Sequence, residues 1–380
     1  MQNEFSRIST GTNPDELINN TNFEKGAFVI VFFGDDFDYK KLYESLKSKK
    51  IPFIGCMDTG RLFSNEYKLD SSSASLMVLT DKIIDKVKLI SYDMRKDISY
   101  SSLKSSSKEL FSNAIQSLGI DASNPDMEST FCINILHGLQ SANPILEGQA
   151  EVSMYLQTVG GSSGGKLDFK LAPVISSQGL GSIGTTAIIK LKDGFYFRTD
   201  LSTSFQKIDG NLKVTGLKSP RHITAFNGNP AEEEYARALN ISTSELTPET
   251  FATYTLGLET GDGERLITSI QQPDGNGGFL TYNDVVEGVN FSIYKSISQE
   301  QFRKDKIQSY LTDEPVAYIS FDCVLCYLAR NSHNEVQKIA DIYNEVLPNT
   351  PKIGFGTFSE NFCGANVNQT ESFLMLLKRG

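Results

Sequence analysis

Apolar and polar residues follow each other along the chain in blocks, and one order of blocks recurs three times. Each repeat begins with a continuous apolar run, which is typical of a strand buried on both faces. A helix-like stretch follows, then a glycine-rich turn with small hydroxylated residues, then another apolar run. The first runs are residues 28–33, 131–136 and 316–321, and the turns are residues 51–60, 156–165 and 350–360. The pattern predicts three diverged β-α-β units, each continued by a glycine turn and a further strand.

The flanking blocks support this repeat. The helix-like stretches are residues 39–50, 144–156 and 334–347, and the runs after the turns are residues 73–79, 185–191 and 370–377. Glycine, serine and threonine punctuate most loops, so similar turns can also arise by chance. If the turns are equivalent, Gly55, Gly160 and Gly354 each follow a strand and precede a polar loop. The first apolar runs are then central buried strands.

Length and composition favour a globular α/β protein of two domains, with mixed sheets covered by helices. The 380 residues exceed one typical core, and 39% hydrophobic residues can fill sizeable cores. Between residues 199 and 220 the apolar density falls and Gly, Lys, Ser and Pro accumulate. We therefore expect a polar amino-terminal segment (1–27), a first domain (28–205), a linker (206–220) and a second domain (221–380).

Charge and cysteine usage narrow the classes of function. The formal net charge is −10, and no basic stripe interleaved with aromatics appears, which argues against a nucleic-acid partner. The amino terminus lacks the blocks of a signal peptide, and no run approaches the roughly 18 apolar residues of a membrane span. Five irregularly spaced cysteines are typical of reduced thiols in a cytoplasmic protein without structural disulfides.

The third turn holds the candidate binding site. Its glycines bring bare backbone to one point, where a ligand can approach closely. Polar side chains crowd around this turn and around the end of the preceding apolar run. The candidate ligand-binding residues are Gly354, Thr357, Glu360, Asn366, Asn368, Thr370, Cys323 and Cys326. Such crowding either serves a ligand or holds a loop closed through internal hydrogen bonds.

Other kinds of chemistry find less support in the sequence. Cys323 and Cys326 have the Cys-x-x-Cys spacing of redox or metal sites, but neither a second pair nor a histidine cluster accompanies them. Glu360 is either a general acid or base, or a hydrogen-bonding carboxylate, which we favour. Residues 160–165 match neither a P-loop nor a dinucleotide fingerprint. The three histidines are too scattered to suggest a zinc or catalytic triad; they are His137, His222 and His333.

Several motifs, in this order, resemble those of the FIST family of intracellular sensory proteins. The matching segments include Ile54-Gly55-Cys56, Phe321-Asp322-Cys323, Gly354-Phe355-Gly356-Thr357, Asn368-Gln369-Thr370 and Phe226-Asn227-Gly228-Asn229-Pro230-Ala231. The resemblance covers about residues 28–377, as a FIST amino-terminal part followed by a carboxy-terminal part. It implies a ligand sensor that works with histidine kinases, cyclic-dinucleotide enzymes or chemoreceptors. A sensor that stands alone would signal through a separate partner.

Within the family, the chain most resembles the branch that binds haem and responds to nitric oxide, but it departs at key positions. Arg61 stands where the family has an acid, Cys326 and Thr268 stand where the branch has arginines, and Asn366 stands where it has histidine. Haem propionates favour cationic partners, and haem iron needs an axial donor. We therefore leave the cofactor unknown and expect haem binding to be weak or absent.

The sequence thus predicts a cytoplasmic sensory protein that binds a small molecule and signals in trans to a histidine kinase or cyclic-dinucleotide enzyme. No nucleic acid or membrane partner is expected. One alternative is a protein-interaction scaffold with a degenerate ligand site, which would show a filled cleft and an exposed apolar patch. The other is an enzyme using Cys323 or Glu360, which would show a depressed thiol pKa or a paired base in a pocket.

Overall fold

The computed structural model describes residues 3–63, 66–68, 70–259, 265–297, 299–332 and 335–380. The chain forms two compact units. The first contains Met1–Leu201, Arg303–Asn366 and Glu371–Gly380, and the second contains Ser202–Phe302 and Val367–Thr370. The chain therefore leaves the first unit and returns to it, in place of the single boundary expected from the sequence.

The expected linker at residues 206–220 is wrong, because strand β14 (Phe205–Ser219) occupies almost all of it. Leu212 and Val214 are buried while their neighbours Asn211, Lys213 and Thr215 are exposed. This alternation is the signature of a half-buried strand. The low apolar density reflected one solvent-facing side of a strand rather than a flexible connection.

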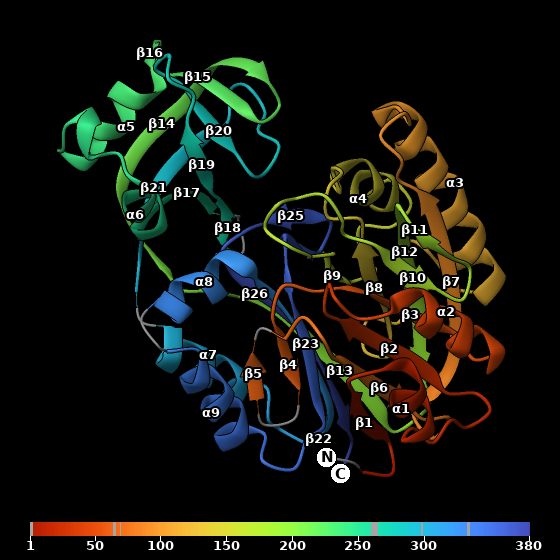
Figure 1. The fold of residues 1–380 in the computed structure, drawn as a ribbon. Helices are drawn as coiled ribbons and strands as arrows, with labels where there is room; N and C mark the ends of the chain where they lie inside the picture. The colour runs from red at the N-terminus through yellow and green to blue at the C-terminus, as the bar shows by residue number, and fades with distance from the viewer. Residues whose placement is uncertain (1–2, 64–65, 69, 260–264, 298, 333–334) are drawn as a thin grey trace. The chain divides into compact units, whose positions relative to one another are not determined.

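Three β-α-β units of the same topology build the first compact unit (Figure 1). In each, the first strand pairs in parallel with the strand that holds the glycines and antiparallel with a later strand. The first contains β2 (Phe28–Phe33), α2 (Tyr39–Ser48), β3 (Phe53–Met57) and β6 (Ala74–Leu79). The second contains β8 (Thr130–Leu136), α4 (Asn143–Ala150), β9 (Thr158–Ser162) and β12 (Ile183–Leu191). The third contains β22 (Glu314–Cys323), α8 (Val324–Ser332), α9 (Val336–Val346), β23 (Lys352–Thr357) and β26 (Thr370–Lys378).

The expected central strands are confirmed, but the first glycine of each expected turn lies within a strand rather than after one. Gly55, Gly160 and Gly354 lie inside β3, β9 and β23. A Cβ atom added to Gly55 would lie 2.0 Å from the carbonyl oxygen of Val31, and one added to Gly160 would lie 1.9 Å from that of Asn134. These glycines therefore allow neighbouring strands to approach closely.

We call β3, β9 and β23 the glycine strands. The sheet of each glycine strand is extended by a hairpin that belongs to a different β-α-β unit. The strands after β3, namely β4 (Arg61–Phe63) and β5 (Glu66–Lys68), extend the sheet of β23. Those after β9, namely β10 (Val174–Ser176) and β11 (Gly179–Gly181), extend the sheet of β3. Those after β23, namely β24 (Ser359–Phe362) and β25 (Ala365–Val367), extend the sheet of β9. This cyclic exchange interlocks three six-stranded sheets.

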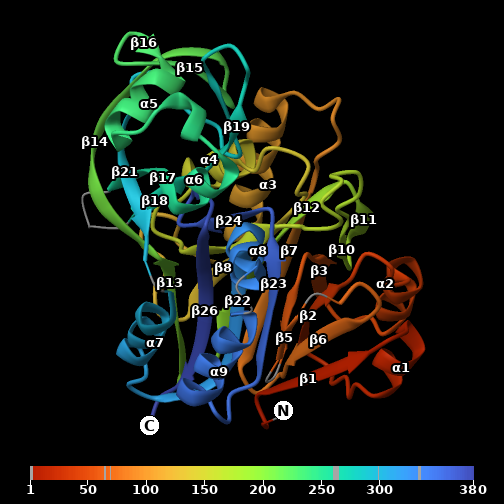
Figure 2. The same cartoon turned by 60° about the vertical axis from the view of Figure 1, so that its left-hand side comes forward.

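At the edge opposite these hairpins, the three sheets end in β1 (Ser6–Gly11), β7 (Ile84–Asp93) and β13 (Phe195–Thr203). The polar amino-terminal segment expected at residues 1–27 thus contains β1, which pairs with β6, and α1 (Pro14–Asn19). One apolar cluster joins the three sheets, with Phe32, Ile133 and Phe321 among its members. Helices pack on the outer faces (Figures 1 and 2). Burial on both faces explains the continuous apolar runs.

The helices of the outer faces divide among the three sheets. Helices α1 and α2 cover the first sheet, and α3 (Tyr100–Leu118) and α4 cover the second. Residues of α7 (Gln299–Ser309), α8 and α9 cover the third. Within the described ranges, no helix is long and apolar enough to cross a membrane.

The second compact unit is built on an antiparallel sheet with its own core. In addition to β14, its strands are β15 (His222–Phe226), β16 (Asn229–Pro230), β17 (Tyr254–Glu259), β18 (Arg265–Thr268), β19 (Ile270–Pro273), β20 (Phe279–Thr281) and β21 (Asn290–Ser296). Its helices are α5 (Ala231–Leu239), η1 (Thr243–Glu245) and α6 (Pro248–Thr253). The core includes Val214, Tyr235 and Phe279.

Candidate functional site

The ends of the three glycine strands meet in a junction of backbone hydrogen bonds. Thr59 N donates to Gly356 O over 3.1 Å, Gly356 N donates to Gly60 O over 2.6 Å, and Gly164 N donates to Met57 O over 2.9 Å. A Cβ atom on Gly356 would lie 1.9 Å from Thr59 O. The glycines of this junction, which we expected to leave room for a ligand, instead leave room for other backbone.

Polar side chains of the third β-α-β unit gather beside this junction, at the carboxyl ends of β22 and β23. Thr357 Oγ1 donates to the Glu360 carboxylate and, over 3.4 Å, to Asp322 O. Asn361 Nδ2 donates to Asn366 Oδ1 over 3.1 Å. Part of the crowding is therefore internal hydrogen bonding. We name Thr357, Glu360, Asn361 and Asn366 the strand-end cluster.

The candidate residues from the sequence do not all belong to this cluster. Cys323 ends β22 and is the register partner of Thr357, and Gly354 lies earlier in β23. Asn368 and Thr370 fall in the second compact unit. There, Asn368 N donates to Ile267 O over 3.3 Å. The neighbouring Gln369 accepts a 2.8 Å hydrogen bond from Ser269 Oγ.

Asn361, which sequence reasoning missed, is the member of the cluster with an unused polar atom. Its side chain is 0% exposed, and its Oδ1 has no hydrogen-bond partner among the residues that the structure describes. A buried polar atom left unpaired needs an explanation, and an absent ligand is one. The sequence signal was the residue's place directly after Glu360, on the strand that follows the third glycine segment.

A buried ionic network lies at the same strand ends, on the helix-covered face of the third sheet. Arg303 of α7 pairs with Asp322 over 2.7 Å and with Glu371 over 2.8 Å. Arg330 of α8 pairs with the other oxygen of Asp322, to which Tyr67 Oη also donates over 2.6 Å. All five side chains are buried. We name Arg303, Asp322, Arg330 and Glu371 the ionic network.

Both carboxylates of the ionic network have ion-pair and hydrogen-bond partners. Burial alone would raise the pKa of Asp322, but the charges of Arg303 and Arg330 outweigh burial, so the pKa is lowered. Glu371 also accepts hydrogen bonds from Tyr318 over 3.0 Å and from Ser320 over 2.6 Å. The Asp322 carboxylate is thus held ionised in the protein interior.

Sequence reasoning missed the arginines of this network. Arg330 follows Cys326 by four residues in an otherwise apolar stretch, which places both on one face of α8. The sequence pattern predicts a helix only from residue 334, so it does not place Arg330 on one. His333 lies outside the described residues. Two guanidiniums are therefore present near the site, although Cys326 stands where the family resemblance implies one.

Arg61, which stands where the family has an acid, forms a separate buried ion pair. Arg61 Nε donates to Asp58 Oδ2 over 2.7 Å, and the other guanidinium nitrogens donate to Ser73 Oγ and Asp70 O, each over 3.0 Å. Burial raises the pKa of Asp58, although Arg61 opposes it. Here the guanidinium serves the structure of the first sheet rather than an anionic ligand.

The described histidines and arginines do not fit a haem site of the expected kind. Position 366 is asparagine, and both guanidiniums of the ionic network already pair with Asp322 and Glu371. His222 Nε2 lies 2.6 Å from Asp274 Oδ2 in the second compact unit. Among the described residues, no group of His, Cys, Asp and Glu could hold a metal ion.

His137 remains the histidine to test as an iron ligand. It follows β8, is buried, and its Nδ1 has no hydrogen-bond partner within the described part of the chain. Burial lowers the pKa of His137 to about 4, with a smaller contribution from the charge of Lys96. The imidazole is therefore neutral at pH 7, which is the form that binds metals.

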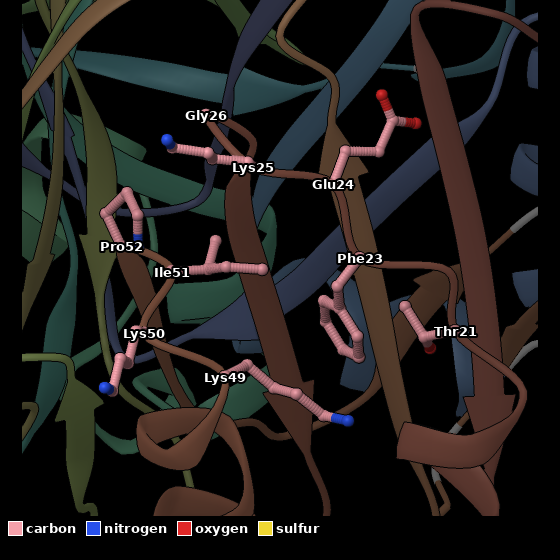
Figure 3. A pocket seen from close by; sticks show the side chains of 9 residues that line it. All are labelled: Thr21, Phe23, Glu24, Lys25, Gly26, Lys49, Lys50, Ile51 and Pro52. Atoms are coloured by element: carbon pink, nitrogen blue, oxygen red, sulfur yellow. The ribbon is translucent and has the colours of Figure 1, made fainter.

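A surface cavity of about 490 Å³ lies at the opposite ends of strands β2 and β3 (Figure 3). It is lined by Thr21, Phe23, Glu24, Lys25, Gly26, Lys49, Lys50, Ile51 and Pro52. Lys49 Nζ lies 5.6 Å from the centre of the Phe23 ring. Lys49 also follows the carboxyl end of α2, whose partial negative charge opposes anion binding. The lysines therefore do not make this cavity an anion site.

Comparisons with known proteins identify the family. A search of curated proteins finds no match. One solved structure, phosphoribosylformylglycinamidine synthase II from Thermotoga maritima, is 10% identical with a TM-score of 0.19, covering 100% of this chain and 73% of that chain. A likeness at that level supports no argument. The model of the FIST N domain matches residues 27–229, the model of the FIST C domain matches residues 231–363, and the chain belongs to the FIST family.

Proposed function

We propose that this protein is a sensor that binds a small molecule with hydrogen-bond donor groups at the strand-end cluster, and that it signals through a separate partner. FIST domains are sensory, ligand-binding domains of signalling proteins. The carboxyl ends of parallel strands are also the usual ligand site of α/β sheets. In this protein the strand-end cluster occupies that place in the third β-α-β unit.

The unused oxygen of Asn361 is the observation on which this proposal rests. Its amide nitrogen is engaged by Asn366, while Oδ1 accepts no hydrogen bond within the described residues. A buried acceptor without a partner costs about 1–3 kcal/mol. A ligand N–H or O–H group would supply the missing donor, and a primary ammonium, which carries three N–H groups, is the donor that we propose.

The path of the chain offers a route for the signal. Asn361 lies in β24 and Asn366 in β25, which form one hairpin edge of the second sheet. The next residue after Asn366 is Val367, where the chain enters the second compact unit. A ligand that tightens this hairpin would therefore act on the segment that leads directly into the other unit. The receiving partner in our proposal is a histidine kinase or a cyclic-dinucleotide enzyme in trans.

A thermal-shift screen with matched amines tests the ligand class. Amino acids and small primary amines are each compared with their trimethylammonium analogues, which keep the charge but lack the N–H donor. A ligand that binds only the folded protein stabilises it by about 2.7 kcal/mol at a hundred times its Kd. We expect a primary amine to raise Tm and its trimethyl analogue to have no effect.

Two variants complete this test. Asn361→Leu removes the acceptor while keeping the branching and the number of side-chain heavy atoms, and Asn124→Leu makes the same exchange at an exposed loop position. The ligand-induced rise in Tm should disappear in the first and persist in the second. Equal responses in both variants, or no response of the wild type to any primary amine, would contradict the proposed site.

A scaffold function also has an observation in its favour. The loop between β9 and β10 exposes three apolar side chains, Leu167, Phe169 and Leu171, at 46%, 49% and 48%. They alternate with Lys166, Asp168 and Lys170. If this loop only docks a protein, changing all three residues to serine should abolish partner binding without any small molecule present. In the sensor we propose, partner binding should depend on the ligand.

A further inference from the structure

Cys323 and Cys326 lie where β22 passes into α8. Cys323 is the last residue of the strand and Cys326 belongs to the first turn of the helix. Both thiols are reduced, and a hydrogen bond joins them. The two thiols are therefore within hydrogen-bond reach of each other, and such proximity is what disulfide formation requires.

The surroundings of this pair are ionic rather than apolar. The hydrogen bond from Cys323 lowers the pKa of the Cys326 thiol, and the charges of Arg330 and Arg303 lower it further. Burial and the charge of Asp322 oppose them but do not prevail. The start of a helix likewise favours a thiolate. Cys326 thus has the two features of a reactive thiol, a lowered pKa and an adjacent second thiol.

The other buried cysteines show what burial alone does. Burial raises the pKa of Cys132 far above its usual range, and it also raises that of Cys56. These two behave as small apolar residues, the ordinary role of a buried cysteine. The difference at Cys326 comes from its neighbours and not from its depth.

We propose that Cys323 and Cys326 are a redox site that closes to a disulfide when it meets a peroxide. The Cys326 thiolate attacks one oxygen of hydrogen peroxide, so an S–O bond forms, the O–O bond breaks, and the departing hydroxide takes a proton to become water. The Cys323 sulfur then attacks Cys326 Sγ. The S–S bond forms, the S–O bond breaks, and the leaving hydroxide takes the Cys323 proton as a second water.

Position assigns the order of these two steps. Cys326 belongs to the first turn of α8, where a thiolate is favoured, so peroxide attacks Cys326 and Cys323 resolves the product. Because the pair is buried, oxidation is slower than that of an exposed thiol. Cys363, which lies in the turn between β24 and β25, is exposed and would react independently. Cys363→Ser is therefore the background for the experiment.

The experiment oxidises the Cys363→Ser protein with hydrogen peroxide, blocks remaining thiols with iodoacetamide, and analyses tryptic peptides by mass spectrometry. Residues 307–330 contain no internal Lys or Arg, so one peptide holds both cysteines. We expect this peptide to lose two hydrogens and to carry no carbamidomethyl group. Dithiothreitol should restore two alkylated cysteines, and circular dichroism should show that the fold is retained throughout.

Two further variants in that background assign the chemistry. Cys132→Ser should still give the disulfide, and Cys326→Ser should not. If peroxide leaves both thiols alkylatable while the protein stays folded, or oxidises Cys326 to sulfinic acid with Cys323 still free, the proposal is wrong. The Cys363→Ser protein by itself gives these outcomes, so the test holds even if the variant with Cys326→Ser fails to fold. Asn361→Leu should form the disulfide normally, so this test is independent of the ligand proposal.

Discussion

Replacing Arg303 by methionine should destabilise the first compact unit more than any single surface change. Methionine keeps most of the buried stem but removes the charge that pairs with Asp322 and Glu371. Asp322 would still have Arg330 and Tyr67, whereas Glu371 would keep only its hydroxyl donors. Removing one partner of a buried ion pair costs about 3–5 kcal/mol. We expect a loss of this size in the free energy of unfolding.

The comparison with Arg330→Met sharpens this prediction. That variant leaves Asp322 paired with Arg303 and leaves Glu371 untouched. Its expected cost is about 1.5–3 kcal/mol, the value of a hydrogen bond to a charged group. The double variant Arg303→Met/Glu371→Gln also removes the Glu371 charge, which Arg303→Met alone leaves without its arginine partner. It should therefore be more stable than the sum of its single changes predicts, by about 0.5–3 kcal/mol.

Urea unfolding followed by circular dichroism measures these differences. The chain contains no tryptophan, so indole fluorescence is not an option. Exposed ion pairs contribute only about 0–1 kcal/mol, and a loss below about 1 kcal/mol for Arg303→Met would show that the network is not buried as described. Strict additivity in the double variant would likewise refute the idea that Glu371 depends on Arg303.

Three further changes have defined outcomes. Gly356→Ala should destabilise the protein by several kcal/mol in thermal unfolding, because its Cβ would lie 1.9 Å from Thr59 O. Gly179→Ala is the control and should have a small effect, because the nearest atom to its Cβ is 3.6 Å away. Equal effects of the two changes would contradict the close backbone packing at the junction of the glycine strands. Burial lowers the pKa of Lys352 to about 8, below its unfolded value of about 10.4, so the unfolded chain binds more protons between these values. Stability relative to Lys352→Met should therefore rise with pH across that window and stay level below it. Titration with hemin should give no sharp stoichiometric Soret shift, and a shift abolished by His137→Ala would overturn that expectation.

The central strands could be predicted because burial on both faces leaves a continuous apolar run in the sequence. Residues 28–33 form β2 with all six side chains buried, and the runs at 131–136 and 316–321 lie within β8 and β22. Order along the chain also indicated the repeat. Local pattern was sufficient here because each β-α-β unit is built from consecutive residues.

Features that depend on distant parts of the chain could not be predicted. Gly160 and Gly161 lie in β9, yet glycine has low strand propensity, so their segment was interpreted as a turn. The close approach of Gly356 to Thr59 joins residues far apart in sequence. The cyclic exchange of hairpins has no local signature either.

The ionic network shows the same limit for the site. Arg303 lies in a polar helical stretch that is typical of a solvated surface. Its partners Asp322 and Glu371 come from two different strands, and its burial appears only when α7 packs on the third sheet. Asp322 was part of a recognised motif, but only the fold shows that two guanidiniums share it.

Native mass spectrometry of the wild-type protein and Asn361→Leu tests the central claim most directly. Both proteins are exposed to the same small-molecule extract of the expression host and desalted under non-denaturing conditions. We predict that the wild type retains one small donor-bearing molecule per chain, released on denaturation, and that Asn361→Leu retains none while keeping its fold. Identical ligand-free spectra for the two proteins, or equal retention by both, would contradict the account.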